Sequence, residues 1–306
     1  MVKRHLKLSL SVVLILAMVF TTACAVDTTY PGTMNVVEVD KAIEDKASDS
    51  NVIIVDARSK EAYDKGHLTH SINISIEEMV VETTVPNMLP SKSEFEQLMS
   101  KKGISNDSIV YVYDDNEGIF ASRLWWTMKV YGHKNVMIIN GGSKALVQKV
   151  GTAGLSAEAT VLEGTQYIAK EADLSMVVTL DEMKSIVDVP KENIKILDVR
   201  SVAEYAEGFI PGAILYPHTQ NLYKDGTFMS SRDLSLFYKD AGFDKEDTII
   251  VYCKTSVRAS QTVALLQEAG YKNLRVYDGA WLEWSSNVDV AAPAEGEAPV
   301  GPSDGS

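Results

Sequence analysis

The chain has 306 residues, of which 45% are hydrophobic and 23% are charged, and its formal net charge is −13 at pH 7. This length is enough for two domains that each bury a core, and the composition is ordinary for a soluble globular protein. The negative charge argues against nucleic acid or an anionic membrane surface as a binding partner. Two cysteines cannot build a disulfide framework, so each needs its own explanation.

The N-terminus has the pattern of an export signal. Basic residues precede an apolar stretch from Leu8 to Phe20, which is too short to span a membrane comfortably, and small residues then lead to Cys24. The pattern resembles a bacterial lipoprotein signal, in which residues 1–23 are removed and Cys24 is lipidated. We therefore expect a cell-membrane lipoprotein facing the outside of the cytoplasm. Cleavage after Ala25 by ordinary signal peptidase would instead give a secreted or periplasmic protein.

The remaining chain repeats one pattern twice. Residues 52–58 return as residues 194–200, and residues 109–113 return as residues 248–252, in each case about 140 residues later. A nearly constant offset of this size indicates a duplicated domain, because solenoids repeat every 20–50 residues or so. The sequence therefore predicts two copies of one domain.

Short β-branched stretches alternate with helical stretches in each copy, which predicts α/β domains with a parallel sheet and helices on both faces. The tail is rich in Pro, Gly, Ala and Glu, so we expect it to be disordered. The predicted segments are a first domain (34–150), a connection (151–173), a second domain (174–290) and the tail (291–306).

Cys253 lies at the carboxyl end of a predicted buried strand, Ile249–Tyr252, and just ahead of a predicted helix. Ligand sites of parallel sheets lie at this edge. The backbone N–H groups at the helix start, the helix dipole, Lys254 and Arg258 all favour the thiolate, which is the nucleophilic form. The alternative is an inert buried cysteine. The polar, basic loop favours a reactive thiol.

Three motifs occur together in the second copy. They are Asp-x-Arg…Glu-Tyr…Gly-x-Ile-Pro-Gly-Ala at residues 198–213, the loop at residues 253–258, and Asp-Gly-x-Trp-x-Glu-Trp at residues 278–284. In combination they resemble the tandem-domain rhodanese (thiosulfate sulfurtransferase) family over roughly residues 36–287. The resemblance implies two rhodanese-like domains. It also implies a non-catalytic first domain, because Asp114 stands at the position of Cys253.

The resemblance implies a sulfurtransferase that uses no cofactor and no metal. A sulfane sulfur would pass from thiosulfate, or less readily mercaptopyruvate, through a Cys253 persulfide to cyanide or a thiol. Backbone N–H groups of the loop would surround the charged outer sulfur. The small-molecule donor and acceptor are then the expected partners, with the membrane reached only through the lipid anchor. The candidate loop and substrate-binding residues are Lys254, Thr255, Ser256, Val257 and Arg258.

Several charged residues have two interpretations. Lys254 and Arg258 could bind an anionic donor or could be solvated loop charges. Asp198 and Arg200 could orient the catalytic loop or form a plain ion pair at a strand end. Arg123 of the first copy could reach the cleft or could pair with a carboxylate elsewhere.

Two other functions use the same loop. A Cys…Arg loop before a helix also serves cysteine phosphatases, but these have one residue more between Cys and Arg than Cys253 and Arg258 do. The present loop is therefore sized for something nearer a single sulfur atom than a phosphate. A persulfide carrier or redox sensor without significant turnover is the second alternative, since an activated thiol would allow it.

Overall fold

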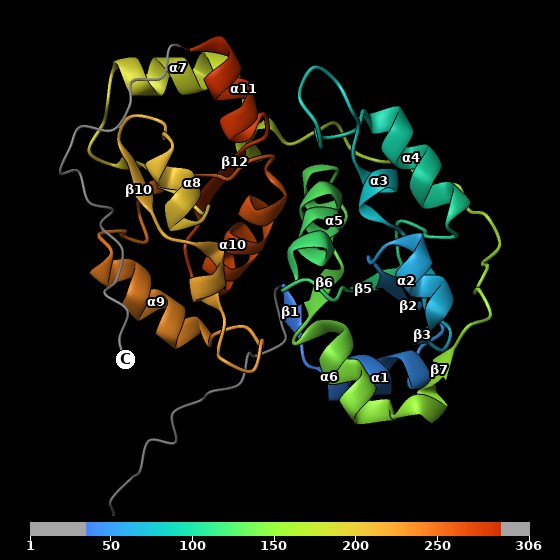
Figure 1. Cartoon of the computed structure of the whole chain (residues 1–306). Helices are drawn as coiled ribbons and strands as arrows, with labels where there is room; N and C mark the ends of the chain where they lie inside the picture. The colour runs from blue at the N-terminus through green and yellow to red at the C-terminus, as the bar shows by residue number, and fades with distance from the viewer. Residues whose placement is uncertain (1–34, 289–306) are drawn as a thin grey trace, which may run out of the picture.

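The computed structural model describes residues 35–288, which form two α/β units (Figure 1). The expected signal at residues 1–23, the candidate lipidation site Cys24 and the expected tail at residues 291–306 lie outside the described residues. Between residues 35 and 288, no helix combines the length and apolarity that a membrane crossing requires.

The sheet of the first unit has five parallel strands in the order β1-β6-β5-β2-β4. They are β1 (Val36–Val37), β2 (Val52–Asp56), β4 (Ile72–Asn73), β5 (Ile109–Tyr113) and β6 (Val136–Ile139). The helices are α1 (Val39–Ser48), α2 (Lys60–Lys65), α3 (Ile76–Met79), α4 (Lys92–Lys101), α5 (Ile119–Val130) and α6 (Gly142–Val150). The central strands are buried along nearly their whole length, as expected for a parallel sheet covered on both faces.

The second unit repeats this topology, with strands in the order β8-β12-β11-β9-β10. They are β8 (Val177–Val178), β9 (Ile194–Asp198), β10 (Ala213–Leu215), β11 (Thr248–Tyr252) and β12 (Asn273–Tyr277). The helices are α7 (Leu180–Asp188), α8 (Val202–Ala206), α9 (Ser231–Asp240), α10 (Val257–Glu268) and α11 (Ala280–Asn287). Two parallel sheets of one topology confirm the predicted duplicated α/β architecture.

Helices α5 and α10 pack side by side between the two units (Figure 1). Each follows the central strand of its own sheet, and each is buried over most of its length. A single hydrophobic cluster includes residues from both units, with Trp125 and Trp126 of α5 fully buried in it. The loops that precede the two helices therefore meet where the units face each other, and Gln261 of α10 donates a 2.7 Å hydrogen bond to the carbonyl of Glu117.

The connection between the units is bound to the first unit. Its short strand β7 (Leu155–Ser156) pairs antiparallel with β3 (His67–Leu68). Further along, Lys170 N–H donates to the Tyr131 carbonyl at 3.1 Å, and Asp173 N–H donates to the Val130 carbonyl at 2.9 Å. Backbone hydrogen bonds therefore hold this stretch in place although it contains little regular structure.

His133 is a buried histidine of the first unit, and its burial predicts that the stability of this unit depends on pH. It is 3% exposed, with Nε2 3.1 Å from the Ser108 carbonyl and Nδ1 2.9 Å from the Tyr167 hydroxyl. Burial lowers the pKa of His133 from 6.5 to about 4. Between these two values the unfolded chain binds a proton that the folded chain does not, so stability is fully present above pH 6.5 and is lost as the pH falls towards 4. The loss can reach about 3 kcal/mol.

We therefore expect the free energy of unfolding in urea to fall between pH 7 and pH 4.5, and to fall by about 2 kcal/mol less in His133→Gln, which does not titrate. His70→Asn is the matched control, because His70 is exposed and its φ of 66° suits asparagine. If His133→Gln loses as much stability on acidification as the wild type, His133 is not the residue responsible.

Candidate active site

Cys253 follows the last residue of β11 and is 1% exposed. Residues 254–256 then turn the chain into α10, with Ser256 as the N-cap. The carbonyls of Cys253 and Lys254 accept hydrogen bonds from Trp281 N–H (3.0 Å) and Leu282 N–H (3.2 Å) in the first turn of α11. Helix α11 therefore holds the carbonyl side of the loop and leaves the loop's N–H groups for other partners.

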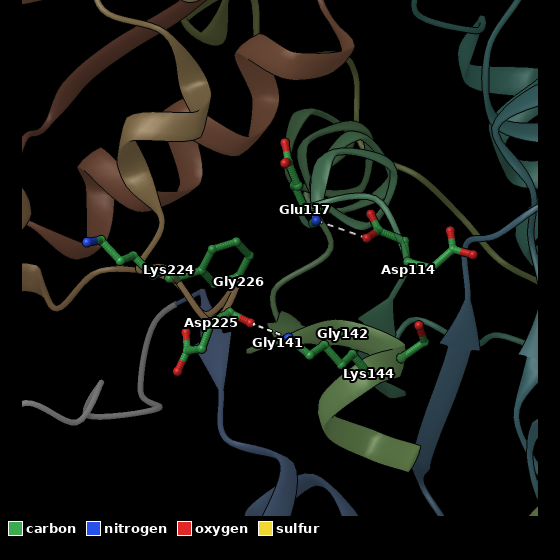
Figure 2. Close-up of a pocket in the computed structure, with 12 residues that line it drawn as sticks. Asp114, Glu117, Gly141, Gly142, Lys144, Lys224, Asp225 and Gly226 are labelled. Carbon is green, nitrogen blue, oxygen red and sulfur yellow. Dashed lines mark hydrogen bonds between the residues drawn. The ribbon is translucent and has the colours of Figure 1, made fainter. Parts of the chain in front are cut away.

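The corresponding loop of the first unit shows what such N–H groups can do. Asp114 follows β5 as Cys253 follows β11, and both strands have the same register with their neighbours. The Asp114 carboxylate is buried and turned towards the loop (Figure 2). It accepts four backbone hydrogen bonds of 2.8–2.9 Å, from the N–H groups of Asn116, Gly118, Phe120 and Ala121. The loop of this fold is therefore an anion-binding nest.

In the second unit the corresponding loop follows a thiol, Cys253. Aligned on the helix starts, the N–H groups of Ser256, Arg258 and Ala259 correspond to three of the four donors that hold Asp114. None of these three N–H groups has an acceptor in the described part of the chain. They are available to an anion carried by residue 253, as the persulfide expected from the sequence would be.

Ser256 adopts the left-handed conformation, with φ of 63°, and is fully buried. Its hydroxyl lies 3.0 Å from Asp278 Oδ1 and 2.6 Å from the Thr255 carbonyl, and it accepts a 2.9 Å hydrogen bond from Arg123. These bonds explain a serine at a position whose backbone favours glycine. In the first unit the equivalent residue is Gly118, where a Cβ would lie 2.4 Å from the Phe228 ring.

Arg258 contacts the Cys253 sulfur but is also bound by a carboxylate. Its Nη1 and Nη2 each donate a 2.8 Å hydrogen bond to Glu204. Burial alone would lower the pKa of Arg258, but the interactions with Glu204 and Cys253 outweigh burial and raise it. In turn, the hydrogen bonds from Arg258 lower the pKa of Glu204 to about 2. Lys254 is exposed and has no ion pair within residues 35–288. A donor-binding role for Lys254 and Arg258 stays a prediction.

Asp198 and Arg200 form a buried pair, with Arg200 Nη2 2.6 Å from Asp198 Oδ2. Asp56 and Arg58 repeat this pair in the first unit at the same distance. Because the first unit has no thiol, the repetition points to a role in fixing the strand end. The link from Arg200 to the loop is indirect, since its guanidinium lies 4.4 Å from the Trp281 ring centre. The supporting role of the pair in catalysis stays a prediction.

The first unit contributes two groups to the loop that follows Cys253. Arg123 of α5 is fully buried, and its Nη1 donates 2.9 Å bonds to both Ser256 and Asp278. Its Nη2 donates to the carbonyl of Asn87, whose side-chain amide in turn donates to the Thr255 hydroxyl at 3.0 Å. Both interpretations of Arg123 therefore apply, because it pairs with a carboxylate and also reaches the loop.

His218 lies beside this loop and is nearly buried, with Nε2 3.1 Å from a Glu117 carboxylate oxygen of the first unit. Burial, followed by the charge of nearby Arg258, lowers the pKa of His218. His218 is therefore neutral at neutral pH. Sequence analysis gave no role to Glu117 or to its contact with the second unit.

A cavity of about 400 Å³ lies at the first unit's loop and not at Cys253 (Figure 2). A hairpin of the second unit closes one side, where Lys144 Nζ donates to the Asp225 carbonyl at 2.8 Å. The four N–H donors beside this cavity already hold Asp114, so the first unit cannot offer them to a sulfur anion. The lining includes Asp114, Asp115, Glu117, Gly118, Gly141, Gly142, Ser143, Lys144, Lys224, Asp225, Gly226 and Phe228.

Comparison with known proteins agrees with the geometry. The family model described as "Rhodanese-like domain" matches residues 36–149 and 179–287. A protein of Mycolicibacterium smegmatis named "Putative thiosulfate sulfurtransferase" is 34% identical over 76% of this chain and 87% of its own length. The "Sulfur carrier protein TtuD" of Thermus thermophilus is 31% identical over 77% of this chain and 85% of its own.

Among solved structures, SseA from Escherichia coli, titled as a 3-mercaptopyruvate sulfotransferase with the "Rhodanese" fold, matches with a TM-score of 0.73 and 25% identity. The match covers 81% of this chain and 99% of that one. Both the repeated fold and the relatives thus point the same way, and the chain belongs to the rhodanese-like family, with two copies of the domain in tandem.

Proposed function

We propose that the protein moves a sulfane sulfur from thiosulfate, through a persulfide on Cys253, to cyanide or a thiol. One observation carries the proposal: Cys253 occupies the position at which the first unit seats a carboxylate on four N–H donors. A persulfide places its negative charge one atom beyond the thiol sulfur, within reach of the equivalent donors of its own loop. Relatives named for thiosulfate sulfurtransferase and for sulfur carriage support the same reading.

The reaction has two balanced steps. The Cys253 thiolate attacks the outer sulfur of thiosulfate, an S–S bond forms, and the bond to the sulfonate sulfur breaks, so that sulfite leaves with the electron pair. Cyanide or a thiolate then attacks the outer persulfide sulfur and regenerates the Cys253 thiolate. Residues 35–288 contain no second cysteine, so the acceptor comes from another molecule. Thiosulfate is preferred over mercaptopyruvate because Lys254, which has no ion pair within residues 35–288, places a cation beside the loop, and thiosulfate carries two negative charges where the mercaptopyruvate carboxylate carries one.

The test is the intact mass of the purified protein after thiosulfate, with and without later cyanide. We expect a gain of about 32 Da, one sulfur atom, that peptide mapping places on Cys253 and that cyanide removes as thiocyanate. A protein that gains no sulfur from thiosulfate, mercaptopyruvate or polysulfide would contradict the proposal. Sulfur found on Cys24 alone would contradict the assignment of the nucleophile.

A second candidate is a persulfide carrier with little turnover, which the similarity to the protein named as a sulfur carrier favours. Both functions predict a persulfide on Cys253. They differ in the second step, because a transferase releases thiocyanate over many cycles with excess thiosulfate and cyanide, whereas a carrier waits for a protein acceptor. Steady-state thiocyanate production separates the two.

We also propose that the protein is exported and anchored by a lipid on Cys24. The support is the sequence pattern ahead of that cysteine, which lies outside the described residues. Cys24→Ser should move the protein from the membrane fraction to the soluble fraction of the expressing cells. An unchanged distribution would remove the lipid anchor and leave the sulfur chemistry unaffected.

A further inference from the structure

The charges around Cys253 are unevenly paired. Arg200 is bound to Asp198, and Arg258 is bound to Glu204 through both terminal nitrogens. Lys254 is the remaining nearby cation, and it has no carboxylate partner within the described ranges. A donor anion that uses Arg258 must therefore displace Glu204 or share the guanidinium with it.

Glu204 is held in place as well as charged. It lies in the first turn of α8, where its carboxylate accepts hydrogen bonds from the Ser201 N–H and hydroxyl at 3.1 Å each. The Glu204 side chain is 28% exposed and that of Arg258 is 20% exposed, so solutes can reach the pair. The pKa of Glu204, lowered to about 2, keeps the carboxylate ionised at neutral pH.

The first unit lacks both members of this pair. Ser59 caps α2 as Ser201 caps α8, but the residue three positions on is Ala62 rather than a glutamate. The position of Arg258 is taken by Phe120. The Asp198–Arg200 pair, in contrast, is repeated in the first unit. The Glu204–Arg258 pair is therefore present in the unit that carries the thiol and absent from the other unit, so the fold itself does not require it.

We propose that Glu204 selects the sulfur donor by charge, disfavouring the thiosulfate dianion relative to organic persulfides of low charge. This inference rests on the proposed function and refines its donor: thiosulfate still loads Cys253, but an organic persulfide loads it at lower concentration. Two negative charges of thiosulfate would lie close to a fixed carboxylate, and such like-charge contacts are costly in a partly desolvated site. An organic persulfide brings at most one negative charge, as RS–S⁻, or none, as RS–SH, and its leaving group is a thiolate instead of sulfite.

The chemistry for such a donor balances without a further reactant. The Cys253 thiolate attacks the outer sulfur of RS–SH, the new S–S bond forms, and the S–S bond of the donor breaks. RS⁻ leaves with the electron pair and takes up the proton, while Cys253 holds the sulfur as Cys–S–S⁻. Both donors thus give the same enzyme intermediate, and their rates can be compared directly.

The test measures how fast Cys253 gains one sulfur in rapid-quench mass spectrometry, at varied concentrations of thiosulfate or 2-hydroxyethyl persulfide. Glu204→Gln keeps an acceptor for Arg258 but removes the charge, so it should lower the half-saturating thiosulfate concentration about tenfold. The persulfide reaction should change by less than about threefold. Glu204→Asp retains the charge and is the matched control, expected to keep the wild-type preference.

The outcomes are distinct. Equal thiosulfate saturation in Glu204→Gln and wild type, or equal changes for both donors, would overturn the charge selection and leave the sulfurtransferase intact. A wild-type protein that takes sulfur from neither donor would overturn the proposed function, and this inference with it. An improvement in Glu204→Asp as large as in Glu204→Gln would show that geometry, not charge, sets the preference.

Discussion

Cys253→Ser is expected to lower the rate of sulfur transfer by at least about a thousandfold. Serine has no accessible anion at neutral pH and cannot hold a sulfane sulfur, so both steps of the reaction are lost. The substitution is nearly isosteric, and the hydroxyl would face the same loop N–H groups, so stability should change by about 1 kcal/mol or less. The measurement is thiocyanate production from thiosulfate and cyanide, together with the free energy of unfolding in urea.

Cys253→Asp provides a sharper companion to this substitution. If the loop is an anion-binding nest, an aspartate at residue 253 should accept hydrogen bonds from the N–H groups of Ser256, Arg258 and Ala259, which correspond to three of the donors that hold Asp114 in the first unit. The variant should therefore be inactive yet at least as stable as Cys253→Ser. Wild-type transfer in either variant would refute the role of Cys253, and strong destabilisation by aspartate alone would refute the nest.

The loop after Cys253 could be predicted because the sequence features that indicate it lie next to one another in the chain. A buried β-branched strand, a polar turn with one cysteine and a helix start are neighbours in sequence, and the first copy has Asp114 at the position that Cys253 occupies in the second. The parallel sheet followed from the same alternation of elements. Both predictions depend on short-range patterns that folding preserves.

The partners of the loop could not be predicted, because they depend on how the two units pack. Arg258 meets Glu204, and Ser256 meets Arg123, only after distant segments come together. One local signal did exist. Arg123 lies in a mostly apolar stretch, close to Trp125 and Trp126, and a charge so placed must find a partner or remain unpaired in the core. The sequence could not tell which carboxylate that partner would be.

Arg123→Met is expected to destabilise the protein by about 3–5 kcal/mol. The loss of the guanidinium leaves Asp278 as a buried charge without its cation, and in the described part of the chain its remaining partners are the Ser256 hydroxyl and the Leu89 N–H (2.8 Å). The reference measurement is urea unfolding of wild type and variant at pH 7. Lys144→Met is a suitable control, because among residues 35–288 the Lys144 ammonium donates to a backbone carbonyl, that of Asp225, and to no carboxylate.

If Arg123 also positions the Cys253 loop, its loss should slow sulfur transfer even in a variant that regains stability. Adding Asp278→Asn to Arg123→Met removes the unpaired charge and should recover about half of the lost stability. Ser256 nevertheless stays without its guanidinium partner, and Thr255 and Asn87 lose the anchor of their own bond. The folded double variant should therefore transfer sulfur about tenfold to a hundredfold more slowly.

The measurement that separates positioning from folding is the rate of Cys253 persulfide formation at saturating thiosulfate. It is made without urea, at a temperature where wild type and double variant are both fully folded. A positioning role predicts a lower maximal rate, because the N–H donors of the loop no longer converge on the outer sulfur. Arg123→Lys should fall between, since an ammonium can pair with Asp278 but cannot span both Ser256 and the Asn87 carbonyl as the guanidinium does. A double variant that transfers sulfur at the wild-type rate would confine Arg123 to stability. The first unit would then support the fold without taking part in the active site.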